Sequence, residues 1–396
     1  MEVMEVMEVM ETMGRAELTD PQAGLPQSEA EEANRLGMMY SSGDGVPQDW
    51  EQARTWFRKA ADRGHANAQF NLGVIYSNGR RAQDYAHALL WYRKAAQQGH
   101  ARAQFNLGLL YGSGQGVPQD HAQALSWYTE AAEQGHAGAQ NNLGLAYVNG
   151  LGVAADGARA LHWFQRAAAQ NDPAAQNNLG LMVASGKSVP QDFSSAADWY
   201  RKAAAQGYAL AQYNLAGLLE AGQGGPADLA QALDWYRRAA EQGLPKAQYS
   251  LALMYDHGHG LARDAQQAMA WYCKAAERGN AHAQFSLGLR YDAGNGVLQD
   301  AAKALSWYRR AADQGHARAQ FNLGTMYAEG HGAEVDLAQA WAWLDLAAGH
   351  GQALARRTRA LLGQRMSSAQ LAQAATQGQQ LRSKLPGDSG AGAAPA

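Results

Sequence analysis

The sequence predicts an all-α fold, an α/α superhelical solenoid of about nine helix-turn-helix repeats of 36 residues. A Leu-Gly or Leu-Ala doublet, a tryptophan and an aspartate each return about every 36 residues. In addition, the ten letters GHARAQFNLG stand at both 99–108 and 315–324, six periods apart. Such a fixed period is the signature of stacked units that bury their apolar sides only against their neighbours. The doublet begins at Leu36, Leu72, Leu107, Leu143, Leu179, Leu215, Leu251, Leu287 and Leu323.

The first helix of each repeat is predicted by apolar and small residues at three- and four-residue spacing, which mark one buried stripe. A glycine inside a helix costs about 1 kcal/mol relative to alanine, so its recurrence in the doublet predicts a close helix–helix approach. The glycines at 114–116 are expected to end this helix, because glycine readily adopts a left-handed cap. In copy three the stripe consists of Ala101, Ala103 or Gln104, Leu107, Gly108 and Tyr111.

The second helix is expected to begin after the recurring aspartate, which in copy three is Asp120. Its carboxylate can accept hydrogen bonds from the first free amides of the helix. The tryptophans supply a large apolar body that is expected to fill the space between neighbouring hairpins. Gly135 closes the helix, and its buried stripe consists of Ala124, Trp127 or Tyr128, and Ala131 or Ala132.

The repeats divide the chain into four expected segments. Residues 1–28 form a disordered N-terminal segment, and residues 29–350 form the nine repeats. Residues 351–385 are expected to hold C-terminal capping helices, over 352–363 and 368–384, with Ser367 or Ser368 as a helix cap. Residues 386–396 form a disordered tail, because their composition offers little apolar surface to bury.

Charge and composition exclude several classes of protein. A net charge of −3 and a pI near 6.5 give no electrostatic reason to expect nucleic-acid binding. No window approaches 18 apolar residues, so no membrane span is expected. The start lacks the basic and apolar regions of a secretory signal, which favours a cytoplasmic location. Which methionine is the first residue of the protein stays open, because translation could begin at Met4, Met7, Met10 or Met13.

Candidate chemical sites all have a simpler structural explanation, and we expect no enzyme activity, cofactor or metal. The lone Cys273 excludes a multi-thiolate zinc site and is expected on a solvated face. The triplet Gly186-Lys187-Ser188 lacks the first glycine of a phosphate-binding loop. His257 and His259 are a weak metal signal, and the histidines after each closing glycine are expected to make turn or interhelix hydrogen bonds. The repeated aspartates occupy separate units and cannot converge as catalysis requires.

The repeat resembles the Sel-one-like repeat family, a relative of the tetratricopeptide repeats. Copy three matches its pattern, A-x-A-Q-x-N-L-G-x-x-Y-x-x-G-x-G-V-x-x-D-x-x-x-A-x-x-W-Y-x-x-A-A-x-x-G, from Ala101 to Gly135. The resemblance implies a right-handed superhelix whose first helices line the concave side. It also implies a non-catalytic scaffold or adaptor for a protein or peptide segment, in a bacterial regulatory, signalling or virulence-related pathway. Cysteine-rich members bind or hydrolyse β-lactams, so a ligand- or cell-wall-binding hydrolase stays as the alternative, although the paired cysteines are missing here.

Two columns of the first helices are the candidate peptide-binding residues. Asparagine can donate to and accept from a peptide backbone, while aromatic rings offer pockets for side chains. The alternative is that each asparagine bonds a neighbouring helix and each ring only packs between copies. One column holds Asn71, Asn106, Asn142, Asn178, Asn214 and Asn322, with Ser250 and Ser286 replacing asparagine. The column before it holds Phe70, Phe105, Asn141, Asn177, Tyr213, Tyr249, Phe285 and Phe321.

Overall fold

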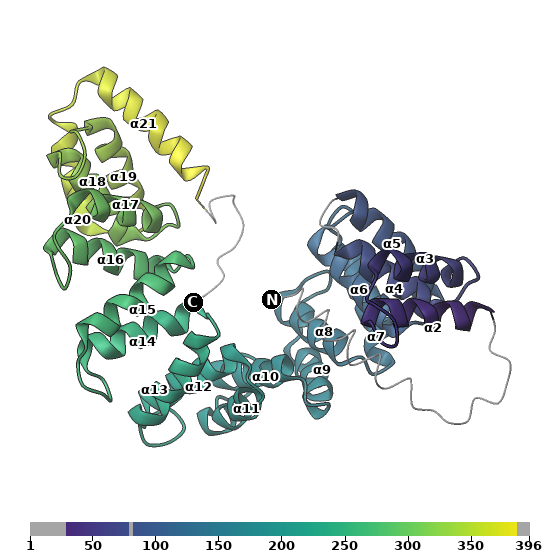
Figure 1. Cartoon of the computed structure of the whole chain (residues 1–396). Helices are drawn as coiled ribbons and strands as arrows, with labels where there is room; N and C mark the ends of the chain where they lie inside the picture. Colours follow the sequence, from purple (N-terminus) through teal and green to yellow (C-terminus); the bar gives the residue numbers. More distant parts are fainter. Residues whose placement is uncertain (1–28, 79–81, 386–396) are drawn as a thin grey trace. The chain divides into compact units, whose positions relative to one another are not determined.

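The computed structural model describes residues 29–78 and 82–385, and these residues form helices without any strand (Figure 1). The all-α prediction is therefore confirmed, whereas the segments 1–28 and 386–396, expected to be disordered, lie outside the described residues. The first helix of each repeat, the A helix, is α2 (Glu29–Ser42), α4 (Ala66–Ser77), α6 (Ala101–Ser113), α8 (Ala137–Asn149), α10 (Pro173–Ser185), α12 (Ala209–Ala221), α14 (Pro245–His257), α16 (Ala281–Ala293) and α18 (Ala317–Glu329). The second, the B helix, is α3 (Trp50–Ala61), α5 (Ala82–Gln97), α7 (His121–Glu133), α9 (Gly157–Ala169), α11 (Phe193–Ala205), α13 (Leu229–Glu241), α15 (Ala265–Glu277), α17 (Ala301–Ala312) and α19 (Leu337–Gly349).

The chain divides into two compact units, Met1–Trp199 and Tyr200–Ala396, with the division inside α11. Within each unit, an A helix packs against its own B helix and against the B helix of the preceding repeat. Two further helices, α20 (Ala353–Gly363) and α21 (Ser368–Arg382), pack against α19. The Ser367 side chain caps α21 in a reciprocal capping box with Gln370.

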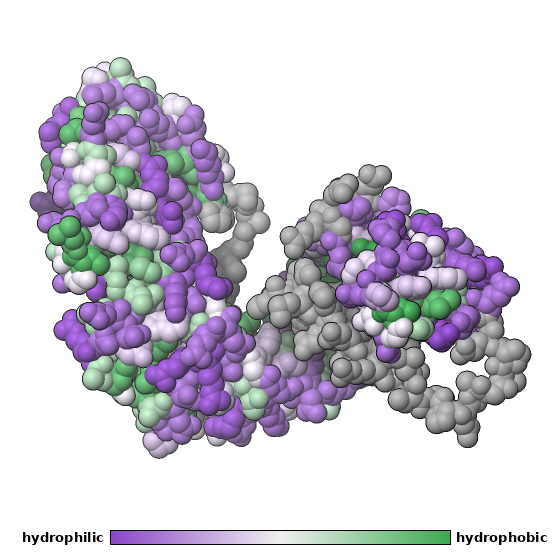
Figure 2. All heavy atoms as spheres, viewed as in Figure 1, coloured by the Kyte–Doolittle hydropathy of each residue, from purple (hydrophilic) through white to green (hydrophobic). Residues whose placement is uncertain are grey.

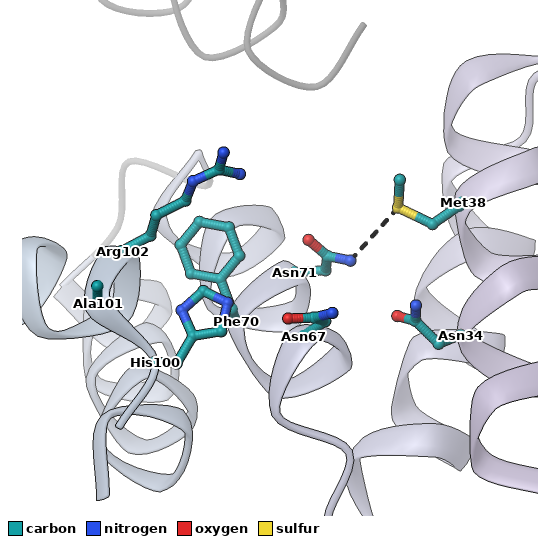
Figure 3. A pocket seen from close by; sticks show the side chains of 8 residues that line it. All are labelled: Asn34, Met38, Asn67, Phe70, Asn71, His100, Ala101 and Arg102. Atoms are coloured by element: carbon teal, nitrogen blue, oxygen red, sulfur yellow. Dashed lines mark hydrogen bonds between the residues drawn. The ribbon is translucent and has the colours of Figure 1, made fainter. Parts of the chain in front are cut away.

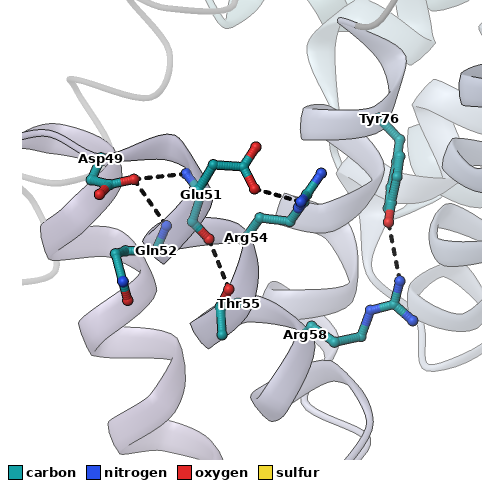
Figure 4. Close-up of polar contacts among 7 residues, drawn as sticks. All are labelled: Asp49, Glu51, Gln52, Arg54, Thr55, Arg58 and Tyr76. Carbon is teal, nitrogen blue, oxygen red and sulfur yellow. Dashed lines mark hydrogen bonds and ion pairs between the residues drawn. The ribbon is translucent and has the colours of Figure 1, made fainter.

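The expected aspartate caps are confirmed except in copy two, where α5 begins at Ala82 and Asp84 therefore lies within the first turn of the helix. The Asp120 carboxylate accepts from the backbone N–H groups of Ala122 and Gln123 at 2.9 and 3.0 Å. Figure 4 shows the same cap in copy one, where Asp49 holds the start of α3. Gly114 ends α6 with a φ of 72°, the left-handed conformation that glycine adopts without a steric penalty.

The doublet glycine marks a close approach, as expected, and the approaching group is an aromatic ring of the B helix. A Cβ atom at Gly108 would lie 2.4 Å from the Tyr128 ring. Of the two alternatives for the B-helix stripe, Tyr128 is the buried side chain, and Trp127 is half-buried. Equivalent pairs are Gly37 with Phe57, Gly73 with Tyr92, Gly144 with Phe164, and Gly288 with Tyr308.

The tryptophans lie between neighbouring hairpins, as predicted. Trp127 packs against the apolar cluster that joins the preceding B helix to α6 through Leu107. Trp163 takes the same place one repeat later, against Leu143. Many of these rings carry a cation three residues on over one face, such as Lys274 at 3.9 Å from the centroid of the half-buried Trp271 ring.

Candidate protein-interaction face

One side of each A helix presents the columns singled out in the sequence. In α6 this side consists of Arg102, Phe105, Asn106 and Leu109, whose spacing of three, four and seven residues places them together. We call these positions, with their equivalents in other repeats, the A-helix face. The opposite stripe, including Leu107, is buried in the core. Over the visible surface, hydrophilic side chains predominate, with small apolar patches between them (Figure 2).

The exposed apolar part of this face is a leucine two residues after the doublet leucine. Leu109 and Leu181 of the first unit are 41% and 46% exposed, and Leu289 of the second is 43% exposed. The two predicted columns lie deeper. Buried members are Phe70, Asn71, Asn141 and Asn177, and the others, half-buried, are Phe105, Asn106, Asn142, Asn178, Tyr213, Asn214, Tyr249, Phe285, Phe321 and Asn322.

Several of the asparagines bond neighbouring helices. The Asn178 amide donates to Asn141 Oδ1 at 2.8 Å, which joins α10 to α8. Asn142 hydrogen-bonds the phenol of Tyr128 on the preceding B helix. Burial raises the pKa of Tyr128, and this hydrogen bond opposes the rise. The packing alternative thus holds at these positions, while peptide binding through the columns stays a prediction.

The histidines that follow the closing glycines are N-caps of the A helices. His100 Nδ1 accepts from the backbone N–H of Ala103 at 3.2 Å, so this nitrogen carries no proton. The His100 ring also stacks on Phe70 of the preceding A helix, with centroids 4.7 Å apart. Burial, reinforced by the charge of Arg102, lowers the pKa of His100 to about 4. The sequence carried a signal for this role, because Asp172 and Asn280 take the same position in other repeats.

A pocket of about 260 Å³ opens on the A-helix face of the first unit, between α2, α4 and α6 (Figure 3). Asn34 stands across the gap from Asn67 and Asn71, and Arg102 lies beside the Phe70 ring. Among the described residues, the buried Asn34 Oδ1 has no hydrogen-bond partner. Sequence reasoning missed Asn34, Asn67 and Arg102. The lining residues are Asn34, Met38, Asn67, Phe70, Asn71, His100, Ala101 and Arg102.

The candidate chemical sites have structural roles. Gly186 ends α10 in the left-handed conformation, so the Gly-Lys-Ser triplet is a helix end. Cys273 is half-buried, contrary to the expected solvated position, and burial raises the pKa of its thiol. The rings of His257 and His259 lie 5.9 Å apart, and no group of three metal-ligating side chains occurs in the described residues. None of the described helices is long and apolar enough to span a bilayer.

The fold places this chain in the class of solenoids built from stacked helical hairpins. Within this class, the chain belongs to the Sel1 repeat family. The family model matches nine times, and each match from the second onward begins at the start of an A helix. This result confirms the resemblance seen in the sequence. The matched residues are 33–65, 66–100, 101–136, 137–172, 173–208, 209–244, 245–280, 281–316 and 317–352.

Solved structures of the same family are similar to this chain. A Sel1 repeat protein from Oxalobacter formigenes is 37% identical with a TM-score of 0.62, over 83% of this chain and 93% of that one. The protective antigen c5321 of uropathogenic Escherichia coli strains, which displays an SLR fold, is 34% identical with a TM-score of 0.50, over 96% and 94%. A search of curated proteins found no match. Solenoids of Sel1 repeats are typical of protein-interaction scaffolds.

Proposed function

We propose that this protein is a non-catalytic scaffold that holds an extended segment of a partner protein on its A-helix face. The observation that carries the proposal is the A-helix face of the first unit, where the exposed Leu109 and Leu181 accompany half-buried amides and rings, and where a pocket opens between α2, α4 and α6. Apolar side chains next to groups that pair with a peptide backbone suit an extended chain. The net charge of −3 favours a protein over a nucleic acid as the partner.

We also propose that the protein is located in the cytoplasm and acts in a bacterial regulatory, signalling or virulence-related pathway. The similarity to proteins of Oxalobacter formigenes and uropathogenic Escherichia coli supports a bacterial setting.

The test of the scaffold function uses the exposed leucines, because changing Asn141 or Asn178 would also break the bond between α8 and α10. In the double variant Leu109→Glu/Leu181→Glu, two charges enter the A-helix face with little expected loss of stability. Partners recovered by affinity purification and mass spectrometry are expected to disappear from this variant. The matched control is Leu90→Glu, since Leu90 is similarly exposed, at 48%, on the B helix α5.

Circular dichroism would establish that both variants keep their helices. Partners that stay bound to the double variant, or that are lost equally from Leu90→Glu, would contradict a binding role for the A-helix face.

A further inference from the structure

One edge of the A-helix face in the second unit carries exposed basic side chains. At the position that Arg102 takes in α6, the successive A helices α14, α16 and α18 (Figure 1) have Lys246, His282 and Arg318. We call these three residues the basic edge. All three side chains are exposed, and among the described residues neither Lys246 nor Arg318 has an ion pair or a hydrogen bond. The charge of this edge is therefore available to a partner.

The carboxylates on the same side of the A helices are already used within the protein. They lie ten residues beyond the first position of the face, about 15 Å further along each helix. Each of them contacts a side chain of a neighbouring helix or loop, which the basic edge does not. The pairs are Glu220 with Tyr236 at 2.8 Å, Asp256 with Arg290, and Asp292 with His331 at 3.0 Å. The charge left without a partner on this face is thus positive.

Ring contacts join the three positions of the basic edge into one surface. The His282 ring stacks on Tyr249 of α14, with centroids 5.8 Å apart. On its other side it meets the ring of His316, the N-cap of α18, edge-on at 5.1 Å. The exposed Leu289 lies on the same face of α16, so an apolar surface stands between the two cations.

The spacing of the two cations suits an extended chain. Helices that lie side by side are about 8–10 Å apart, so Lys246 and Arg318, two repeats apart, are separated by roughly 16–20 Å. An extended segment rises about 3.3 Å per residue, so about five or six residues cover this distance. The middle of such a segment lies over α16 and Leu289.

We propose that the basic edge binds an acidic, extended segment of a partner protein. Two Asp or Glu side chains, about five or six positions apart, pair with Lys246 and Arg318 through charge-assisted hydrogen bonds. An apolar side chain between them packs on Leu289. This inference rests on the proposed scaffold function and adds the chemistry of the bound segment.

The experiment is selection of a bead-bound library of random nonapeptides, blocked at both termini, by the full chain. Blocked termini ensure that every carboxylate comes from a side chain. We expect the wild-type protein to enrich peptides with two acidic residues about five or six positions apart. The enrichment is expected to vanish with Lys246→Gln/Arg318→Gln.

The second unit contains a matched control for these two charges. Lys274 and Arg310 are also one lysine and one arginine with exposed side chains, but they belong to the B helices α15 and α17. The variant Lys274→Gln/Arg310→Gln therefore changes the net charge equally and leaves the basic edge intact. It is expected to keep the acidic enrichment.

Affinities of one enriched peptide then test the pairing directly. Replacing either acidic residue by its amide is expected to weaken binding to the wild-type protein about fivefold, the upper range for an exposed ion pair. Arg318→Glu is expected to weaken the acidic peptide further, and a lysine at the paired position of the peptide is expected to restore binding. Leu289→Glu is expected to weaken the acidic peptide as well, because it replaces the apolar contact by a like charge.

The outcomes separate this inference from the scaffold function. If no peptide is enriched by the wild-type protein, the scaffold function fails and the basic edge fails with it. If peptides are enriched and blocked by Leu109→Glu/Leu181→Glu, but none has the acidic pair, only the basic edge fails. An acidic preference that survives in Lys246→Gln/Arg318→Gln, or disappears equally in Lys274→Gln/Arg310→Gln, overturns it too.

A nucleic acid is the competing anionic partner. A labelled single-stranded DNA oligonucleotide is expected to bind more weakly than the enriched peptide. Tighter binding of the oligonucleotide that is lost in Lys246→Gln/Arg318→Gln would overturn the proposal, because the basic edge would then bind phosphates.

Discussion

The two copies of GHARAQFNLG, at 99–108 and 315–324, have the same local structure and different surroundings. His100 and His316 both cap an A helix, with Nδ1 3.2 Å from a backbone nitrogen in each case. Both stack on a phenylalanine of the preceding A helix, at 4.7 and 4.6 Å. The ten residues therefore determine helix start, cap and buried stripe wherever they occur, because these features depend on local spacing.

The difference lies in what the neighbouring repeats place against them. Next to the first copy stand Asn34 and Asn67, which leave the pocket open. Next to the second copy, the His282 ring stacks on Tyr249 and meets His316 edge-on at 5.1 Å. The shape of this surface is thus a property of adjacent repeats, and identical stretches of sequence can lie on different surfaces.

The largest effect on stability is expected at the doublet glycine, where the two copies face different side chains. Gly108→Ala is expected to destabilise the protein by about 2 kcal/mol, because the new Cβ would lie 2.4 Å from the Tyr128 ring. Gly324→Ala is expected to cost more, about 3 kcal/mol, since its new Cβ would lie 2.8 Å from Leu344 Cγ and 3.0 Å from the backbone carbonyl oxygen of Ala340, which cannot rotate away. Denaturant unfolding, with hydrogen exchange to assign the affected unit, measures both changes.

Natural alanines in other repeats explain why the expected cost at 108 is moderate. In copy six, Ala216 replaces the glycine, and the Tyr236 ring lies at 54° to Tyr213. In copy three the corresponding angle between Phe105 and Tyr128 is 43°. A small rotation of the ring thus accommodates a methyl group, and equal costs at 108 and 324 would contradict the role we assign to the ring.

The second-largest expected effect is a loss of stability in mild acid, because the histidine caps have different pKa values in the folded and unfolded states. The pKa of His100 and of His316 is about 4 in the folded protein, against 6.5 for an unperturbed histidine. Between these values the unfolded chain binds more protons than the folded one, so stability is full above pH 6.5 and falls toward pH 4. Burial is the main cause in both. The charge of Arg102 adds to it at His100, and that of His282 adds to it at His316.

The test is the double variant His100→Asn/His316→Asn, because Asn280 provides the same cap at 2.8 Å without a titrating ring. Its unfolding free energy is expected to depend less on pH between 4 and 6.5 than that of the wild-type protein. NMR titration of the two rings would reveal the pKa values directly, and values near 6.5 would contradict this mechanism.

The sequence predicted the period, the two helices of each repeat, the aspartate caps and the close approach at the glycine. All of these depend on residues within one repeat, so a single copy contains the necessary pattern. The family followed from the same pattern, and the nine matches confirm it.

The pocket could not be predicted in the same way. Asn34 and Asn67 lie on A helices of different repeats, α2 and α4, and come to line one pocket only when the two repeats stack. The predicted asparagine columns lie along one side of the A helices, and several of their members bond adjacent helices. Single-repeat patterns do not distinguish an amide that binds a partner from one that supports a neighbour.

A smaller effect is expected where the buried glutamine pairing is interrupted. In copy three, the Gln134 amide donates to Gln104 Oε1 at 2.6 Å. In copy seven the donor is replaced by Arg278, and the buried Gln248 Oε1 has no partner among the described residues. Arg278→Gln is expected to stabilise the second unit by about 0.5–1.5 kcal/mol, measured by denaturant unfolding. Unchanged or lower stability would mean that the Arg278 bond to the Gly243 carbonyl contributes as much.

The smallest effect concerns the same pairing in copy nine, where His350 takes the place of the glutamine. His350 Nδ1 lies 2.9 Å from Gln320 Oε1, so the buried oxygen already has a donor. His350→Gln exchanges one donor for another and is expected to change the unfolding free energy by less than about 0.5 kcal/mol. A loss above 1 kcal/mol would show that the imidazole packs in a way that the glutamine of copy three does not reproduce. The two copies would then differ in their buried bonds as well as in their surfaces.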